Sequence, residues 1–171
     1  CRLVSKKPYD KVGICGADID TIQARNFGRM VAAGSAAHTD HGMGMVDLFR
    51  EVVTGVNKEY EIKDWAKLRA VAASIDIPIE DRTPAEIAND LADLYIAQFG
   101  QQIGSIVPVG RAPEKRVKLW KEQGVVPRGI DREVVEALHR THMGDDQDPA
   151  HILNHAVRTS LADGWGGSMI G

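Results

Sequence analysis

Apolar residues recur along most of the chain at the three- and four-residue spacing of an α-helix. The first such stretch runs from Asp20 to about Ala37. Its apolar positions are Ile22, Phe27, Met30, Val31 and Gly34, with alanines between them. Small side chains let neighbouring backbones approach closely, so we expect this helix to be buried on several sides, against other helices or a cofactor wall.

Capping signals mark the helices that follow. A separate helix is predicted from Val46 to Val56, and Asp64 is a credible N-cap for the next one, which ends near Pro78. Thr83-Pro-Ala-Glu86 has the residues of a capping box and predicts a helix that ends at Gly100. Three further helices are predicted over Ala112–Gln123, Asp131–His142 and Asp148–Asp163.

The fold class expected from this pattern is all-α. Few segments show the strict alternation of β-strands, and no internal repeat or low-complexity linker divides the chain. We expect a loop over residues 1–17 followed by one helical domain over residues 18–171. The chain begins without methionine and stops in an apolar stretch, so it is expected to be part of a longer protein, truncated at both ends.

Composition narrows the possible partners. The 171 residues are 43% hydrophobic, which excludes a disordered tail, and the net charge of −3 gives no electrostatic footprint for nucleic acid. Apolar runs stay short of the roughly 18 residues of a membrane span. With only two cysteines, reduced thiols and a cytoplasmic location are expected.

Cys15 offers the most specific chemistry. It lies between glycines and is followed by Asp18 and Asp20, which indicates a loop leading into a helix N-terminus, where a thiolate is favoured. Such a place suits a thiolate-bound metal cluster. Cys1 is the only other cysteine, and two thiolates cannot complete a four-cysteine iron–sulfur site, so the missing ligands are expected upstream of Cys1.

His38 and His41 form the second candidate site. They lie three residues apart, near the predicted C-terminal end of the first helix, where the helix dipole favours an imidazolium. General acid–base work or a proton relay is one interpretation. Helix capping or packing is another, and a metal-ligand pair completed by Asp40 or Asp47 is a third.

The remaining histidines and glycines point to ordinary structural roles. His139 and His142, like His151 and His155, have helical spacing but no carboxylate or cysteine placed to complete a site, so they are expected to cap, pack or face solvent. Residues 164–167 lack the lysine and hydroxyl residue of a phosphate loop, and close helix packing explains their glycines.

Several blocks of the sequence resemble the N-terminal part of the catalytic subunit of nickel-dependent carbon monoxide dehydrogenase. The specific part runs from Cys15 to His41 and includes Gly13-Ile-Cys-Gly-Ala-Asp18 and Ala36-Ala-His-Thr-Asp-His-Gly42. The later matching blocks are Tyr60–Asp64, Leu119–Pro127, Gly129–Val134, Leu138–Gly144 and Ala162–Ser168. The likeness extends over nearly the whole chain.

The resemblance implies an enzyme that oxidises carbon monoxide with water to carbon dioxide, two electrons and two protons. Proteins of that family are homodimers in which a helical N-terminal domain precedes two α/β domains. The reaction takes place at a nickel–iron–sulfur cluster. By resemblance, Cys1 and Cys15 are the last two ligands of a [4Fe-4S] cluster. His38 assists proton transfer beside the nickel–iron cluster, and His41 continues the path toward solvent.

The same resemblance shows which parts of the family's proton path and cluster site this chain lacks. Some relatives continue the histidine series where this chain has Gly44 and Asp47, and the ligands of the nickel–iron cluster belong to a part that is absent here, so the fragment alone is expected to be inactive. An electron acceptor such as a ferredoxin is implied, together with an acetyl-coenzyme A synthase or a hydrogenase as a possible partner.

Two other readings compete with this one. A hybrid-cluster protein-type iron–sulfur oxidoreductase has a similar helical region and a cysteine-bound cluster, although the match at His38 and His41 argues against it. A helical interaction module without any cofactor, in which the cysteines are incidental, is the alternative from another class.

Overall fold

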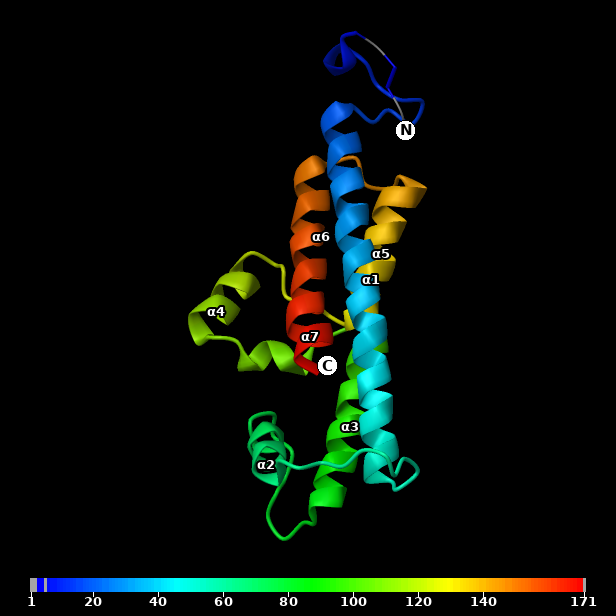
Figure 1. Cartoon of the computed structure of the whole chain (residues 1–171). Coiled ribbons are helices and arrows are strands. Elements are labelled where there is room, and N and C mark those ends of the chain that lie inside the picture. Colours follow the sequence, from blue (N-terminus) through cyan, green and yellow to red (C-terminus); the bar gives the residue numbers. More distant parts are fainter. Residues whose placement is uncertain (1–2, 5, 171) are drawn as a thin grey trace.

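A single long helix organises the molecule. The computed structural model describes residues 3–4 and 6–170, and the regular secondary structure of that part consists of helices alone, without a β-strand. Helix α1 (Ile19–Val53) is 35 residues long and runs beside all the other large helices in turn (Figure 1). Its N-cap is Asp18, whose carboxylate accepts the backbone N–H of Thr21 at 2.8 Å.

The prediction of two separate helices, 20–37 and 46–56, is wrong. The segment between them contains Gly42 and Gly44, which are poor helix formers. Tertiary packing overrides that weak propensity, because Thr39, Gly42 and Val46 are buried and continue the contact face of α1 through this segment.

The buried face of α1 follows a repeat of alternating four- and three-residue steps. Its members are Thr21, Arg25, Gly28, Ala32, Ser35, Thr39, Gly42 and Val46, and Ile22 and Ala24 are buried beside its N-terminal end. This spacing averages 3.5 residues, as in coiled coils, and keeps one narrow stripe against the partner helices over the whole length. The other side is open: Phe27 is 52% and Met30 is 71% exposed, so the expectation that α1 is buried on several sides is wrong for the part of the chain described here.

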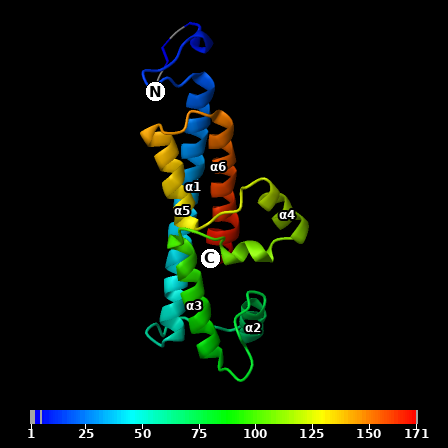
Figure 2. The same ribbon diagram turned by 180° about the vertical axis from the view of Figure 1, so that it is seen from behind.

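Different helices cover the two halves of α1. Helices α5 (Ile130–Leu138) and α6 (Pro149–Ala162) pack against its N-terminal half, and α3 (Pro84–Gly100) against its C-terminal half. The view from behind shows the same arrangement, with the N-terminal loop projecting beyond the start of α1 (Figure 2). The smaller elements are η1 (Pro8–Asp10), α2 (Trp65–Ala73), η2 (Val107–Arg111), α4 (Glu114–Glu122), η3 (His139–Met143), η4 (Asp163–Gly167) and α7 (Ser168–Ile170).

The predicted caps are confirmed. Asp64 accepts the backbone N–H of Lys67 at 2.8 Å and starts α2. Thr83 and Glu86 form the reciprocal capping box that begins α3. The three helices predicted after residue 111 all occur, although α5 ends at Leu138 and gives way to the π-helical turn η3, so its last predicted turn is wrong.

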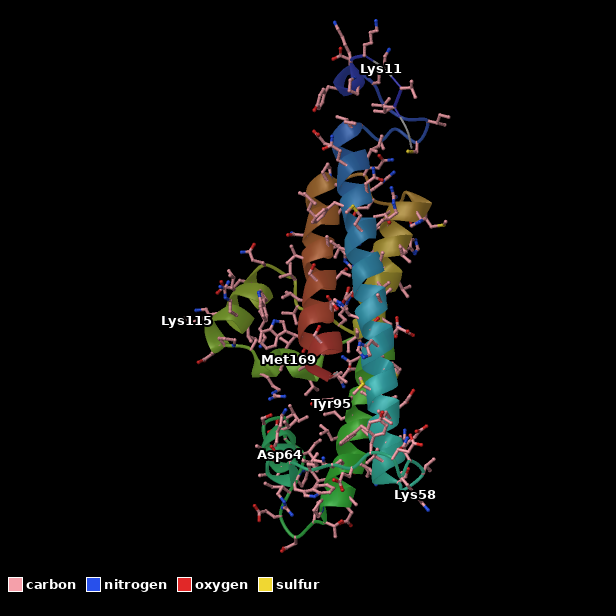
Figure 3. All side chains as sticks on the ribbon, in the orientation of Figure 1. Lys11, Lys58, Asp64, Tyr95, Lys115 and Met169 are labelled. Carbon is pink, nitrogen blue, oxygen red and sulfur yellow. The ribbon has the colours of Figure 1, made fainter. Side chains whose placement is uncertain are left out.

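The largest apolar core lies at the C-terminal half of α1. Phe99 and Ile87 of α3 are buried there, with Ile106 and Ile130. Figure 3 shows Tyr95 on α3 facing this region, whereas Lys11, Lys58 and Lys115 lie at the periphery. Among the residues placed in the structure, no helix combines the length and apolar character needed to cross a membrane.

The closest contact on the stripe joins Gly42 of α1 to Gly167 of η4. A Cβ atom added to Gly42 would lie 2.9 Å from the carbonyl oxygen of Gly167. That oxygen belongs to backbone and cannot rotate away, so only glycine fits here. Close packing, predicted for the glycines of residues 164–167, is confirmed for Gly166 and Gly167, whereas a Cβ atom at Gly164 would meet no described residue within 4 Å.

Gly42→Ala is expected to lower the free energy of unfolding of the 171-residue chain by about 1 to 3 kcal/mol, because α1 and η4 must move apart. Gly34→Ala is the matched control on the same helix: its Cβ would meet nothing within 4 Å among the residues placed. Better helix propensity should raise stability there by up to about 1 kcal/mol. Urea unfolding measures both, and equal effects would contradict the packing argument.

Candidate functional site

The Cys15 loop forms a tight turn directly before α1. Gly16 adopts φ of 82°, its N–H donates to the Gly13 carbonyl at 2.9 Å, and the Gly13 N–H donates to the Ala17 carbonyl at 2.7 Å. The exposed Cys15 thiol has a pKa below its ordinary value, because the backbone N–H of Ala17 and the guanidinium of Arg25 both stabilise the thiolate.

Residues more than a hundred positions away hold this loop in place. Gln147 Nε2 donates to the Cys15 carbonyl at 2.6 Å, and Thr21 Oγ1 donates to the Gln147 carbonyl at 2.9 Å. Arg25, 5% exposed, donates through Nη2 to the Asp146 carbonyl at 2.6 Å. The segment after α5 is therefore tied both to the start of α1 and to the cysteine loop.

The residues of this loop fit a thiolate-ligated cluster. An accessible sulfur that carries two thiolate-favouring donors is the kind of ligand that iron–sulfur clusters use. The apolar side chains of Val12 and Ile14 are exposed on the same loop, which suits a wall around a cofactor. Cys1, the other predicted ligand, lies outside the described residues, and within those residues no three His, Cys, Asp or Glu side chains converge on one metal position.

His38 has a partner that the sequence did not reveal. Its Nδ1 lies 2.9 Å from Oδ1 and 3.1 Å from Oδ2 of Asp163, the first residue of η4. A carboxylate is an acceptor only, so Nδ1 donates and Nε2 is left as the basic nitrogen. The imidazole remains 64% exposed, whereas the aspartate is 24% exposed, so an oriented base faces outward from a partly buried carboxylate.

The predicted electrostatic environment of the histidine pair is wrong. His38 and His41 lie in the interior of α1, several turns before its end at Val53, and a helix dipole acts only within the last turn. The carboxylate of Asp163 supplies the negative partner instead. His41 is exposed one turn further along α1, so both imidazoles remain accessible.

The histidine pair and the cysteine loop lie far apart within one chain. Asp18 ends the loop and His38 follows twenty residues later on the same unbroken helix. At about 1.5 Å per residue, this places the two sites about 30 Å apart along α1. The cysteine loop and the histidine pair are therefore separate sites, joined by one helix.

A partly buried ionic network links α5 to the cysteine loop. Glu133, whose side chain is fully buried, accepts Arg128 Nε at 3.0 Å and Nη2 at 2.8 Å. Glu136 accepts Arg140 Nε at 2.9 Å and also contacts Arg128, while Arg140 Nη1 reaches Asp146 Oδ2 at 2.5 Å. Burial alone would raise the pKa of Glu136, but the two guanidinium groups prevail and lower it to about 2.

Comparison with known proteins decides the family. The sequence matches the Prismane/CO dehydrogenase family over residues 1–171. It is 51% identical to carbon monoxide dehydrogenase 1 of Methanosarcina acetivorans, over 99% of this chain and 27% of that protein. The chain belongs to the Prismane/CO dehydrogenase family.

Solved structures agree with this assignment. The nickel-free crystal structure of carbon monoxide dehydrogenase from Thermococcus sp. AM4 superposes with a TM-score of 0.94 at 45% identity, covering 99% of this chain and 27% of that one. A structure of acetyl-CoA synthase/carbon monoxide dehydrogenase gives a TM-score of 0.92 at 32% identity, over 99% of this chain and 26% of that one. The chain spans about a quarter of the length of these relatives.

Membership of the Prismane/CO dehydrogenase family confirms the resemblance stated from the sequence, and the all-helical fold of one part of a larger protein. The family assignment does not test individual site residues. Three residues at the candidate sites had no signal in the sequence: Asp163, Arg25 and Gln147. Their roles depend on partners between 119 and 132 positions away, which periodicity and local spacing cannot reveal.

The other histidines pack or face solvent, as expected, but carboxylates that the sequence did not reveal lie beside three of them. His155 is buried, and its Nε2 lies 3.1 Å from the Glu133 carbonyl, so it packs inside the ionic network. Burial lowers its pKa. His139 contacts Asp145 at the surface, and Asp148 caps α6 through the N–H groups of Ala150 and His151.

Acid should weaken this network in a defined window. The pKa of Glu136 in the folded chain, about 2, is below its ordinary 4.5, so the stability that it contributes is present above about pH 4.5 and is lost as pH falls toward about 2. Glu136→Gln should lower stability by about 2 kcal/mol at neutral pH and flatten the loss in this window.

Urea unfolding of the 171-residue chain at several pH values measures this effect. Glu122→Gln, which replaces an exposed glutamate on α4, is the control and should leave the pH dependence unchanged. An equally steep acid dependence in Glu136→Gln would contradict the assignment.

Proposed function

We propose that this chain is the helical part of a nickel-dependent carbon monoxide dehydrogenase, which oxidises carbon monoxide with water to carbon dioxide, two electrons and two protons. The observation that carries the proposal is the pairing of His38 with Asp163 on a chain of this family. This pairing would supply an oriented, accessible base for the proton removal that the reaction requires.

His38 would accept a proton at Nε2. The reaction releases protons from water, and a positioned imidazole accelerates such a step by about 10² to 10⁴. Donation from Nδ1 to Asp163 holds the ring and stabilises the imidazolium that forms. His41, accessible one turn further along α1, would receive the proton next.

Cys15, together with Cys1, would hold a [4Fe-4S] cluster that carries electrons. A nickel–iron–sulfur cluster, held by residues outside this chain, supplies the site at which carbon monoxide and water react. The residues of this chain contribute elsewhere: Cys15 binds the electron-carrying cluster, and Arg25 and Gln147 hold the loop in which it lies.

The proposal includes partners and a compartment. We propose a homodimer in the cytoplasm, with a ferredoxin-like protein as electron acceptor. The similar structure of acetyl-CoA synthase/carbon monoxide dehydrogenase supports an acetyl-CoA synthase as a partner, and a hydrogenase is the alternative.

The proton-transfer role predicts a specific loss. In the chain extended to the length of its relatives, His38→Ala should lower carbon monoxide oxidation by about 10² to 10⁴ with normal nickel and iron content. Asp163→Asn should lower it by at least about tenfold, because the ring loses its orienting charge. His151→Ala, at an exposed histidine 3.9 Å from an aspartate, is the control. Unchanged turnover in His38→Ala would refute the role.

The ligand role is tested by metal analysis. Cys15→Ser in the same full-length protein, purified without oxygen, should lose the iron and the absorption of one [4Fe-4S] cluster. A full iron count would reject Cys15 as a ligand. A full-length protein that stays colourless after reconstitution with iron and sulfide would favour the helical module without a cofactor.

A further inference from the structure

We infer that Arg25 sets the reduction potential of the cluster held by Cys15, by donating a hydrogen bond to the cysteine sulfur. The inference rests on the proposed function, because it requires Cys15 to be a cluster ligand. It gives a role to a buried arginine that the carbon monoxide reaction itself does not use.

The guanidinium of Arg25 is fixed from several sides. Nε donates to the Asp146 carbonyl at 3.1 Å, and Nη2 donates to the carbonyls of Asp146 and Gly144 at 2.6 and 3.2 Å. These bonds leave Nη1 directed toward Cys15, with its nitrogen 3.7 Å from Sγ. Because the planar group is held by backbone oxygens, it cannot turn away to solvent without breaking three hydrogen bonds.

The carbonyl acceptors are themselves held in place. Gly144 adopts φ of 77°, a conformation that lets the chain turn sharply after η3, and Asp146 is fixed through its carboxylate by Arg140. The ionic network of α5 therefore supports the position of Arg25.

A donor at this sulfur favours the reduced cluster. Reduction adds one electron, which in the proposed function comes from carbon monoxide, and raises the negative charge on the cluster and its sulfur ligands. An N–H donor with a positive charge stabilises the more negative form to a greater extent, so the reduction potential rises. Arg25 is 5% exposed and weakly screened, whereas Lys6 and Lys11 of the same loop are exposed to water and salt.

The test is a redox titration of the chain extended to its relatives' full length, followed by the electron paramagnetic resonance signal that Cys15→Ser abolishes. Arg25→Gln should shift the reduction equilibrium of that cluster toward the oxidised form by about tenfold, equivalent to about 59 mV for a one-electron couple. Arg25→Lys, which keeps the charge with a less suitable donor, should shift it in the same direction by less.

Two controls separate the donor from its surroundings. Arg29→Gln removes a positive charge one turn along α1, from a side chain that donates to the Thr141 carbonyl at 3.2 Å and not to Cys15. Lys11→Gln removes an exposed positive charge from the cysteine loop itself and leaves Arg25 intact. Both should keep the potential of the parent protein.

Each result has a distinct meaning. An unchanged potential in Arg25→Gln, or an equal shift in Arg29→Gln or Lys11→Gln, overturns the role of Arg25 and leaves Cys15 as a ligand. If Cys15→Ser retains all its iron, the proposed ligand and this inference fail together. If Arg25→Gln assembles no cluster, Arg25→Lys decides: a lowered potential supports the inference, and the potential of the parent protein overturns it.

Discussion

Close packing along one narrow stripe of α1 determines the arrangement of the whole chain. The stripe is made largely of small residues, and at Gly42 the backbone of η4 comes so near that no side chain fits between them. This approach, together with the packing of α6 on α1, brings the start of η4 beside α1, where Asp163 meets His38. The close packing of small residues, which have no reactive groups, thus positions the hydrogen bond between His38 and Asp163.

The N-terminal half of the molecule depends on a different interaction. Here the contacts of α1 with α5 and the segment after it include charged side chains that are largely buried. Arg25 donates to the Asp146 carbonyl, and Glu133 and Glu136 pair with Arg128. Such groups are tolerated inside a protein only when every charge has a partner. The same requirement fixes the turn at Gly144 and, through it, the cysteine loop.

Local signals in the sequence were sufficient to predict most of the helices and their caps, but not the contacts between helices. The capping residues Asp64 and Thr83 could be predicted because their partners lie within one helical turn. The break predicted after Ala37 was wrong because the propensity of Gly42 is outweighed by burial at a site formed by residues far along the chain. Asp163 and Arg25 escaped prediction for the same reason, whereas the likeness around Cys15 and His38 pointed to the correct family.

The glycines of α1 also affect how the histidines can move. Gly34 and Gly44 lie on either side of His38 and His41, and among the residues described nothing packs within 4 Å of the positions their Cβ atoms would occupy. Glycine is where a long helix bends most easily. Gly42 is held against η4 between them, so a bend at Gly34 or Gly44 would move the flanking parts of α1 and leave the contact between His38 and Asp163 in place.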